Sequence, residues 1–263
     1  MNCIAYSLQD PIAVQVIAEL RRLVQLEERN STPEYTAYAG RGCSMVALAG
    51  PSITADFLDA LGAERIVFVS RHSSAKGMAS FTTHATGNWS GTSDYGGKPR
   101  ELSVASPLCM LSFLSEISRE AAGLGVPVTY EATHHGPLLS TPSLFAEIGP
   151  VEVPMDPRRA KALAGSVASL LGGEEPEFDK VALGIGGTHY PEKFTKLALS
   201  GKYAFSHIMS RYYAGEAGML EKAVQRSEAR PEVAVLDWKG IRSEHKPGVL
   251  AELDRLGLDH EKV

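Results

Sequence analysis

Histidine residues gather in three short segments of this sequence, each directly after a run of apolar residues. Arg71-His72 follows IVFVS, Thr133-His134-His135 follows VPVTYEA, and Thr188-His189 follows VALGIGG. Short apolar runs of this kind are typical of buried strands. The carboxyl ends of parallel strands lie on one edge of a sheet, where ligands bind. We therefore expect histidines that are far apart in the sequence to meet at one site.

Imidazole groups bind metal ions and also act as general acids and bases. The cysteines restrict which metal chemistry is possible. Cys3, Cys43 and Cys109 are odd in number, widely spaced and without a CxxC pair. This usage fits a reducing compartment and argues against both a disulfide framework and a thiolate zinc site. Any metal is therefore expected to use histidine and carboxylate ligands.

The segment EATHHGP, which begins at Glu131, supplies a carboxylate and two imidazoles within five positions. In an extended strand Glu131 and Thr133 share one face while His134 lies on the other. Gly136-Pro137 predicts a turn, which would let His134 and its neighbour both serve the site. The alternative is that both histidines merely cap the strand by bonding backbone carbonyl groups.

The segment GIGGTHYP is a glycine-rich turn between a predicted strand and a predicted helix. At Gly186, Gly187 and Thr188 the backbone can approach a ligand closely, and N–H groups of the following helix can face a phosphate or an oxyanion. The segment lacks the Gly-Lys-Ser/Thr ending of a Walker loop and does not complete GxGxxG. We therefore interpret it as a tight turn that places His189 in a site.

Residues 71–100 are rich in Gly, Ser, Thr, Asn and His and show little periodicity. A loop of that length inside a compact domain is usually functional or disordered. Its TTHATGN segment can bring His84 and Asn88 over the strand edge, since loop residues of this type are often functional. The alternative is an exposed loop with incidental polar residues.

Apolar runs alternate with segments of helical periodicity along the chain, which is typical of βαβ units and predicts an α/β fold. A short helix is expected just before Gly62, and residues 144–153 are expected to hold a short helix and a strand. We expect strands over 2–7, 44–49, 65–70, 126–131, 181–185, 203–206 and 233–236, and helices over 10–28, 107–124, 156–171, 191–199, 215–226 and 246–256.

The 263 residues suffice for one large α/β domain, which we expect to span 1–263. The acidic stretch GGEEPEFD, residues 172–179, is the best candidate for a boundary within it. The first segment lacks a basic n-region, and no uninterrupted apolar stretch reaches about 18 residues, so neither a signal peptide nor a membrane span is expected. We expect a cytoplasmic protein.

The net charge of −5 gives no global signature of nucleic-acid binding, and DNA is not an expected partner. Residues 186–213 are locally basic, however, with Lys193, Lys196, Lys202 and Arg211 against Glu192. A basic surface beside His189 is one interpretation. The other is that these lysines are ordinary solvated positions on helices.

Several motifs occur together in the order and spacing of one known family. RHSS, TTHATGN, EATHHGP, GIGGTHYP, SHIMSRY and DWKG follow one another along the chain. Over roughly residues 1 to 260 the sequence resembles the archaeal and plant type of D-aminoacyl-tRNA deacylase. One departure is visible in EIGPVE, residues 147–152, where Pro150 stands in place of the serine expected in the family.

The resemblance implies a zinc-dependent esterase that removes D-amino acids mischarged on tRNA, a proofreading step in translation. It implies a three-layer α/β/α fold around a mostly parallel mixed sheet, similar to those of peptidyl-tRNA hydrolase, nucleoside phosphorylases and zinc exopeptidases. The implied partner is the 3′ acceptor end of D-aminoacyl-tRNA, and we expect a monomer.

Ester hydrolysis needs a nucleophilic water and a stabilised oxyanion. Zinc held by three histidine or carboxylate ligands with one open position lowers the pKa of bound water to about 7. We expect His84, His134 and His189 as ligands. Glu131 is the expected general base, with His135 and Thr133 completing the catalytic set. Substrate contacts are expected from His72, Asn88, Gly186, Gly187, Thr188, Lys193, Lys196 and His207.

Two other functional classes use the same residues. A zinc amidohydrolase or exopeptidase would apply the histidine-rich edge to small peptide-like substrates. A phosphorylase-like enzyme or a nucleotide-binding module would use the glycine-rich turn for phosphate. A cysteine nucleophile is disfavoured because Cys3, Cys43 and Cys109 lie outside the histidine segments, and no GxSxG motif favours serine.

Overall fold

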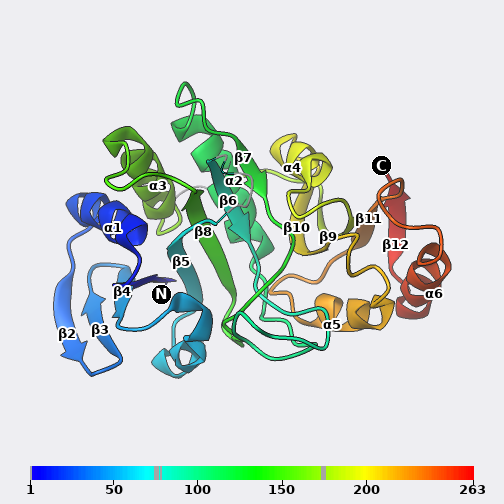
Figure 1. Cartoon of the computed structure of the whole chain (residues 1–263), viewed down its shortest axis with the longest axis horizontal. Coiled ribbons are helices and arrows are strands. Elements are labelled where there is room, and N and C mark those ends of the chain that lie inside the picture. Colours follow the sequence, from blue (N-terminus) through cyan, green and yellow to red (C-terminus); the bar gives the residue numbers. More distant parts are fainter. Residues whose placement is uncertain (1, 74–76, 78, 173–175) are drawn as a thin grey trace.

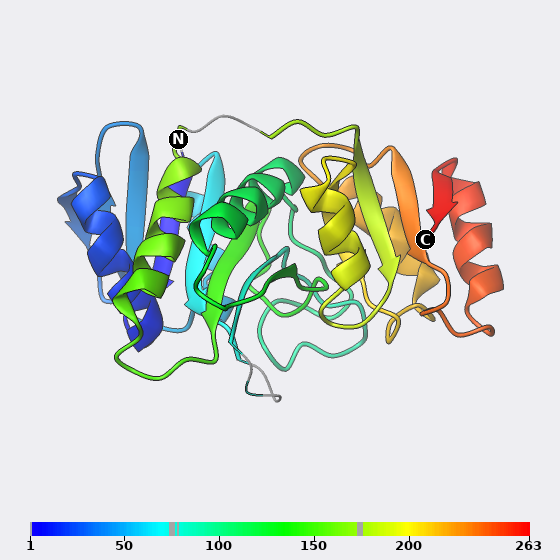
Figure 2. The ribbon, with the colours of Figure 1, turned by 90° about the horizontal axis from the view of Figure 1, so that it is seen from above.

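A computed structural model describes residues 2–73, 77, 79–172 and 176–263. Strands occupy the middle of the molecule and helices cover them on both faces (Figures 1 and 2). This is the α/β/α layering expected from the alternation of apolar runs and helical segments.

The larger sheet has the strand order β2-β3-β4-β1-β5-β8-β6-β7. Its centre is parallel from β4 through β1 and β5 to β8, whereas the β2–β3 hairpin and β6 run antiparallel to their neighbours in that centre. The strands are β1 (Asn2–Ser7), β2 (Glu27–Ser31), β3 (Tyr35–Ala39), β4 (Cys43–Leu48), β5 (Arg65–Arg71), β6 (Ser80–His84), β7 (Val128–Tyr130) and β8 (Ser143–Gly149).

The smaller sheet is entirely parallel and has the order β10-β9-β11-β12. Its strands are β9 (Lys180–Gly186), β10 (Tyr203–Met209), β11 (Val233–Asp237) and β12 (Asp259–Lys262). The segment after β7 reaches across to this sheet, because the Thr133 N–H donates to the carbonyl oxygen of Ile208 at 2.9 Å. The two sheets therefore meet where the EATHHGP segment lies.

The helices divide between the two faces. Helices α1 to α4 pack on one side of both sheets; α5, α6 and the 3₁₀ turns at residues 52–61 pack on the other. Bounds are α1 (Pro11–Leu23), α2 (Pro107–Glu120), α3 (Pro157–Ser169), α4 (Glu192–Leu199), α5 (Leu220–Gln225) and α6 (Lys246–Leu256).

Strand alternation builds these layers, because successive side chains point to opposite faces of a sheet. In β1, Ile4 and Tyr6 join the core beneath α1 to α4, whereas Cys3 and Ala5 join the core on the opposite face. The core under α1 to α4 includes residues of both sheets, such as Val235. The expected boundary at residues 172–179 includes 173–175, which lie outside the described residues.

Helix α1 is tied directly to the strand end that carries a site histidine. The Asp10 carboxylate accepts from the N–H groups of Ile12 at 2.9 Å and Ala13 at 3.2 Å, which caps the helix. Its other oxygen accepts from the N–H of Arg71 at 2.6 Å. One buried carboxylate thus fixes both the start of α1 and the residue before His72.

Most expected elements are present, but four local expectations were wrong. Helix α1 ends at Leu23 and not at residue 28, because the charged EERNS segment has no apolar face and forms exposed strand β2. Residues 71–100 contain the buried strand β6. No helix interrupts residues 143–149, which form β8, and the C-terminal strand β12 was not anticipated.

Among the described residues, no helix is both long enough and apolar enough to cross a membrane. The α2 helix, at 14 residues, falls short of the length that a bilayer requires.

Replacing Asp10 tests how far α1 and the His72 strand end depend on one carboxylate. We expect Asp10→Ala to lower the free energy of unfolding by about 2–3 kcal/mol, since it removes a helix cap and leaves the partly buried Arg71 N–H without its partner. The matched control is Asp156→Ala. Asp156 caps α3 through the Arg158 N–H and pairs with the exposed Arg158 side chain, so its loss should cost less than the loss of Asp10. Urea denaturation measures both, and equal losses would contradict the assignment.

Candidate functional site

The histidine segments converge between the two sheets, on one face of the larger sheet. His84 ends β6, Glu147 lies on β8, and His72 directly follows β5. His134 and His135 follow β7, and His189 lies in the turn between β9 and α4. The expected convergence of the histidines is therefore present, but not at one carboxyl edge, because β6 and β7 run antiparallel to β5 and β8.

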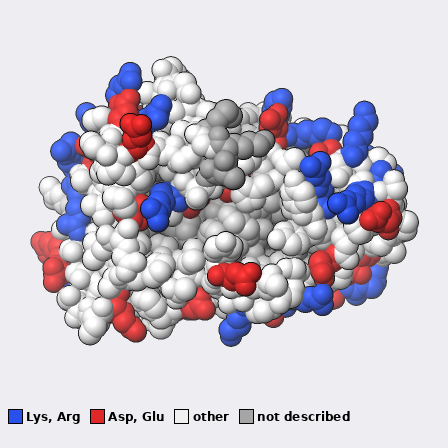
Figure 3. Space-filling view, in the orientation of Figure 1, with Lys and Arg blue, Asp and Glu red and all other residues white. Residues whose placement is uncertain are grey.

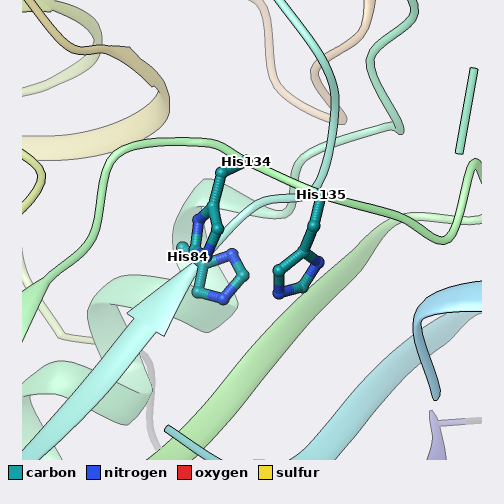
Figure 4. Close-up of side chains that lie close together, drawn as sticks. All are labelled: His84, His134 and His135. Carbon is teal, nitrogen blue, oxygen red and sulfur yellow. The ribbon is translucent and has the colours of Figure 1, made fainter. Parts of the chain in front are cut away.

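His84, His134 and His135 form a compact imidazole cluster (Figure 4). The ring centroid of His84 lies 4.2 Å from that of His134 and 4.9 Å from that of His135. The rings of His134 and His135 are 4.3 Å apart. His84 is 1% exposed, so the cluster has a buried side.

Each imidazole of this cluster has its Nδ1 atom bound to a backbone carbonyl oxygen. His84 bonds Ala85 at 3.1 Å, His134 bonds Ala132 at 2.9 Å, and His135 bonds Gly136 at 2.5 Å. A carbonyl oxygen accepts and never donates, so each Nδ1 must carry the proton. In the neutral rings the lone pair is then left on Nε2, which is the arrangement of metal-ligating histidines.

Burial and mutual repulsion keep two of these rings neutral. Burial, followed by repulsion from His84 and His135, holds the pKa of His134 well below its usual range. Burial and His84 lower the pKa of His135 to about 4. Burial also disfavours charge on His84, but Glu147 outweighs it and raises the pKa of this imidazole. Glu147 therefore attracts positive charge to the His84 side of the cluster.

Glu131 is the central carboxylate, and its side chain is inaccessible to solvent. One oxygen lies 2.7 Å from His189 Nε2 and 3.7 Å from His134 Nε2. The other lies 3.0 Å from His72 Nδ1. Burial alone would raise the pKa of Glu131, but His189 and His72 hold it well below its usual range. Glu131 is therefore ionised.

His72 is a cation held between two carboxylates. Its Nδ1 lies 3.0 Å from Glu131 and 3.7 Å from Glu147. Burial would lower the pKa of His72, yet these two carboxylates raise it to about 11. Its Nε2 is 2.7 Å from the Tyr190 hydroxyl, and a protonated ring donates there. His72 thus positions Glu131 and does not face a ligand.

Three groups of side chains within the described chain bring potential metal-ligand atoms within 4.8 Å of one another. The first contains His84, His134 and His135. The second contains Glu131, His134 and His189, and the third contains His72, Glu131 and Glu147. The expected set of His84, His134 and His189 is divided between the first two groups, with His134 shared.

The turn that lets adjacent histidines face one site begins at His135 itself. This residue has φ of 46°, a left-handed conformation that is uncommon outside glycine. Gly136 follows, and a Cβ atom there would lie 2.3 Å from the Gly97 nitrogen. Close approach of the 96–97 loop to this turn therefore requires glycine at 136.

The GIGG turn also needs its glycines. Gly186 and Gly187 have φ of 100° and 77°. The Gly187 carbonyl accepts from the Arg211 N–H at 3.0 Å, which joins the turn to the segment after β10. Thr188 is exposed, and its hydroxyl donates to the carbonyl of Tyr190 at 2.9 Å.

Three residues expected at the site also make contacts that hold it together, and two of them, Asn88 and Thr133, line the pocket beside the imidazoles. The Asn88 amide donates to the carbonyl of Gly96 at 2.9 Å. The Thr133 hydroxyl accepts from the Ile208 N–H at 3.1 Å and lies 3.2 Å from His207 Nδ1. His207 is fully buried. These contacts indicate positioning roles for all three expected site residues.

The expected basic residues differ in whether they are paired with a carboxylate. Lys193 Nζ lies 2.7 Å from Asp237 and 3.0 Å from the carbonyl of Val263. Lys202 is paired with Glu261 at 3.0 Å. Lys196 is exposed on α4. Figure 3 shows Lys and Arg side chains gathered over α4 and the strands beside it.

A pocket of about 360 Å³ opens beside the imidazoles. Its lining includes His134, His135 and His189, together with residues of the 87–95 and 210–213 segments. A substrate group that enters this pocket meets the imidazoles of His134, His135 and His189.

Comparison with known proteins identifies the family of the chain. The family model of D-aminoacyl-tRNA deacylase matches residues 60–261. The chain belongs to the D-aminoacyl-tRNA deacylase family. A deacylase of this family from Pyrococcus furiosus is 44% identical over 76% of this chain and 73% of its own. One from Staphylothermus marinus is 34% identical over 92% of each chain.

A crystal structure of a conserved protein of unknown function shares this fold. It covers 100% of this chain and 95% of its own, with a TM-score of 0.91 and 32% identity. A futalosine hydrolase from Helicobacter pylori matches with a TM-score of only 0.39 and 9% identity.

Two residues of the site, Glu147 and Tyr190, were not predicted from the sequence. Glu147 enters the sequence analysis only as the first residue of EIGPVE, although a lone carboxylate inside the apolar run SLFAEIG indicates a buried partner. Tyr190 follows His189 directly and binds His72. Glu152, from the same acidic segment, is exposed.

His207 should make the fold sensitive to acid. Burial lowers its pKa to about 4, while in the unfolded chain the value is about 6.5. The unfolded state therefore binds the proton first, and stability falls as the pH drops from about 6.5 to about 4. The full loss from this group is about 3 kcal/mol.

Urea titrations across that pH range, with and without His207→Gln, measure this contribution. We expect the variant to be less stable at neutral pH and to lose less stability on acidification. Replacing the exposed His260 with Gln provides the matched control. An acid slope identical in wild type and His207→Gln would refute the assignment.

Proposed function

We propose that this protein hydrolyses the ester bond of D-aminoacyl-tRNA and releases a free D-amino acid and tRNA. The observation that carries the proposal is the imidazole cluster of His84, His134 and His135, whose Nε2 atoms are freed for a ligand beside an open pocket. Membership of the deacylase family supplies the substrate. We further propose that the protein acts as a monomer in the cytoplasm.

The same cluster fits a zinc ion. His84 Nε2 is buried and has no hydrogen-bond partner among the described residues, and the nearest carboxylate oxygen, on Glu147, is 3.7 Å away. Neutral imidazole is a preferred zinc ligand. We propose His84, His134 and His135 as the residues that hold zinc. Bound there, zinc would lower the pKa of a water molecule and polarise the ester carbonyl.

His189 is assigned a different role from the one first expected. Its Nε2 is 2.7 Å from Glu131, so the ionised carboxylate keeps the Nε2 proton in place. Nδ1 is then the basic atom of a side chain that is 39% exposed and lines the pocket. We propose that His189 takes the proton from the attacking water at Nδ1, with Glu131 orienting the ring and stabilising its charged form.

His72 and Glu147 support this pair from behind. The cationic His72 ring neutralises Glu131 in the buried site and is itself fixed by the Tyr190 hydroxyl. Glu147 lies 3.7 Å from His84 Nε2, on the buried side of the imidazole cluster. Replacing His72 would leave a buried carboxylate with one partner fewer, which costs several kcal/mol.

The proposed activity is tested with D-tyrosyl-tRNA and L-tyrosyl-tRNA, each incubated with the enzyme in the presence and absence of a chelator. We expect release of the D-amino acid alone, and loss of that release when the metal is removed. Equal hydrolysis of both forms would refute the selectivity. Cleavage of dipeptides with neither ester hydrolysed would instead favour an exopeptidase.

The proposed zinc ligands are tested by metal content and not by activity. We expect His84→Ala and His135→Ala to weaken zinc binding by more than about tenfold, since each removes a ligand. His189→Ala should keep its zinc and lose hydrolysis. The exposed His260→Ala is the control. If His135→Ala keeps its zinc and His189→Ala loses it, the ligands are His84, His134 and His189 instead.

A further inference from the structure

Two tyrosines at the pocket beside the imidazoles are unusually exposed. Tyr95 is 72% exposed and Tyr212 is 62% exposed, and among the described residues they are the aromatic side chains that stand out in this way. Both line the same pocket of about 360 Å³ as His134 and His189. Exposed aromatic rings beside a site provide stacking surfaces for nucleic-acid bases.

Backbone hydrogen bonds attach Tyr95 and the residue before Tyr212 to the histidine segments. The Tyr95 carbonyl accepts from the Gly136 N–H at 2.9 Å, next to His135. On the other side, the N–H of Arg211 donates to the Gly187 carbonyl at 3.0 Å, near His189. Their place relative to the imidazoles is therefore set by the same turns that set the histidines.

A positive charge lies directly beside Tyr212. The Arg211 guanidinium carbon is 5.2 Å from the Tyr212 ring centroid, and within the described part of the chain the group makes no ion pair with a carboxylate. Arg211 also lines a second hollow of about 210 Å³, together with Gly187, Thr188 and Lys193. The hollow is also lined by Glu192 and Phe194, at the start of α4.

The charges of the two hollows differ. The pocket that contains Tyr95 and Tyr212 includes the carboxylate of Asp94, which repels phosphate. The neighbouring hollow is lined by two cations and two carboxylates. Lys193 is paired with Asp237, and Arg211, which makes no ion pair in the described part of the chain, shares the hollow with Glu192. A nucleic-acid backbone is therefore favoured on the Arg211 side, with its terminal base in the pocket.

We propose that Tyr212 stacks on the base of the 3′-terminal nucleotide and that Arg211 contacts the adjacent phosphate. The terminal ribose ester then faces His134 and His189. This inference deepens the proposed function and rests on it, because it assigns the binding of the RNA end to residues outside the imidazole cluster and the Glu131–His189 pair.

The stacking is tested with a short uncharged RNA that ends in CCA, and with the same RNA carrying an abasic terminal nucleotide. Fluorescence anisotropy gives the affinity of each for wild type, Tyr212→Ala and Tyr212→Phe. We expect Tyr212→Ala to bind the intact RNA about 10-fold to 100-fold more weakly, as expected for loss of one base–aromatic contact. Tyr212→Phe, which keeps the ring, should bind like wild type.

Removing the terminal base should weaken wild type by a similar factor and leave Tyr212→Ala almost unchanged, since the two losses remove one contact. If removal of the base and Tyr212→Ala weaken binding additively, the proposal is wrong. So would unchanged RNA affinity together with reduced hydrolysis of aromatic D-amino acid esters alone, which would place the amino-acid side chain on Tyr212.

The phosphate contact is tested by the dependence of affinity on salt. We expect Arg211→Gln to reduce the slope of log affinity against log salt by roughly 0.7, the value for one contact to single-stranded nucleic acid. An unchanged slope would overturn this part. Because uncharged RNA is not hydrolysed, wild type that binds it as expected but leaves D-tyrosyl-tRNA intact would refute the proposed function alone.

Discussion

The site is organised by the need to keep the buried Glu131 carboxylate ionised. An uncompensated carboxylate in the protein interior is strongly disfavoured, and Glu131 is 1% exposed. Its two oxygens are therefore held by His72 on one side and His189 on the other, at 3.0 and 2.7 Å. Those two partners come from different sheets. Ionisation of Glu131 thus requires that the sheets meet, and the fold has to deliver both histidines together.

Separate parts of the chain hold each partner in place. The Asp10 carboxylate, which caps α1, also binds the Arg71 N–H and so fixes the strand end before His72. On the other side the Ala132 N–H donates to the carbonyl of His189 at 2.8 Å. The segment that carries Glu131 is therefore attached to the turn that carries its partner. The cap of α1, the end of β5 and the segment that crosses between the sheets together fix the position of the Glu131 carboxylate.

The layers of this fold were predictable from the sequence, because strand alternation and helix caps are local signals. Asp10 and Asp156 begin helices as expected from their position before proline. The convergence of histidines was predictable from their place after apolar runs. The sequence did not predict which histidines could bind the same ligand. That depends on which ring nitrogen of each histidine is hydrogen-bonded to a backbone carbonyl oxygen. Glu147 was not assigned to the site for a similar reason: its partners lie on β6 and after β5, far away in the sequence.

Identical imidazoles acquire different roles here through their neighbours alone. His72 lies between two carboxylates, which raise its pKa to about 11 and make it a fixed cation. His207 is buried among backbone carbonyls and a hydroxyl, so burial lowers its pKa to about 4 and it remains neutral. His135 has a pKa of about 4 as well, but its neutral ring leaves Nε2 free because Nδ1 is bound to a carbonyl. The number of histidines near the site is therefore larger than the number that can react. The charge of each ring and the direction of its hydrogen bonds decide whether it can accept a metal ion or a proton.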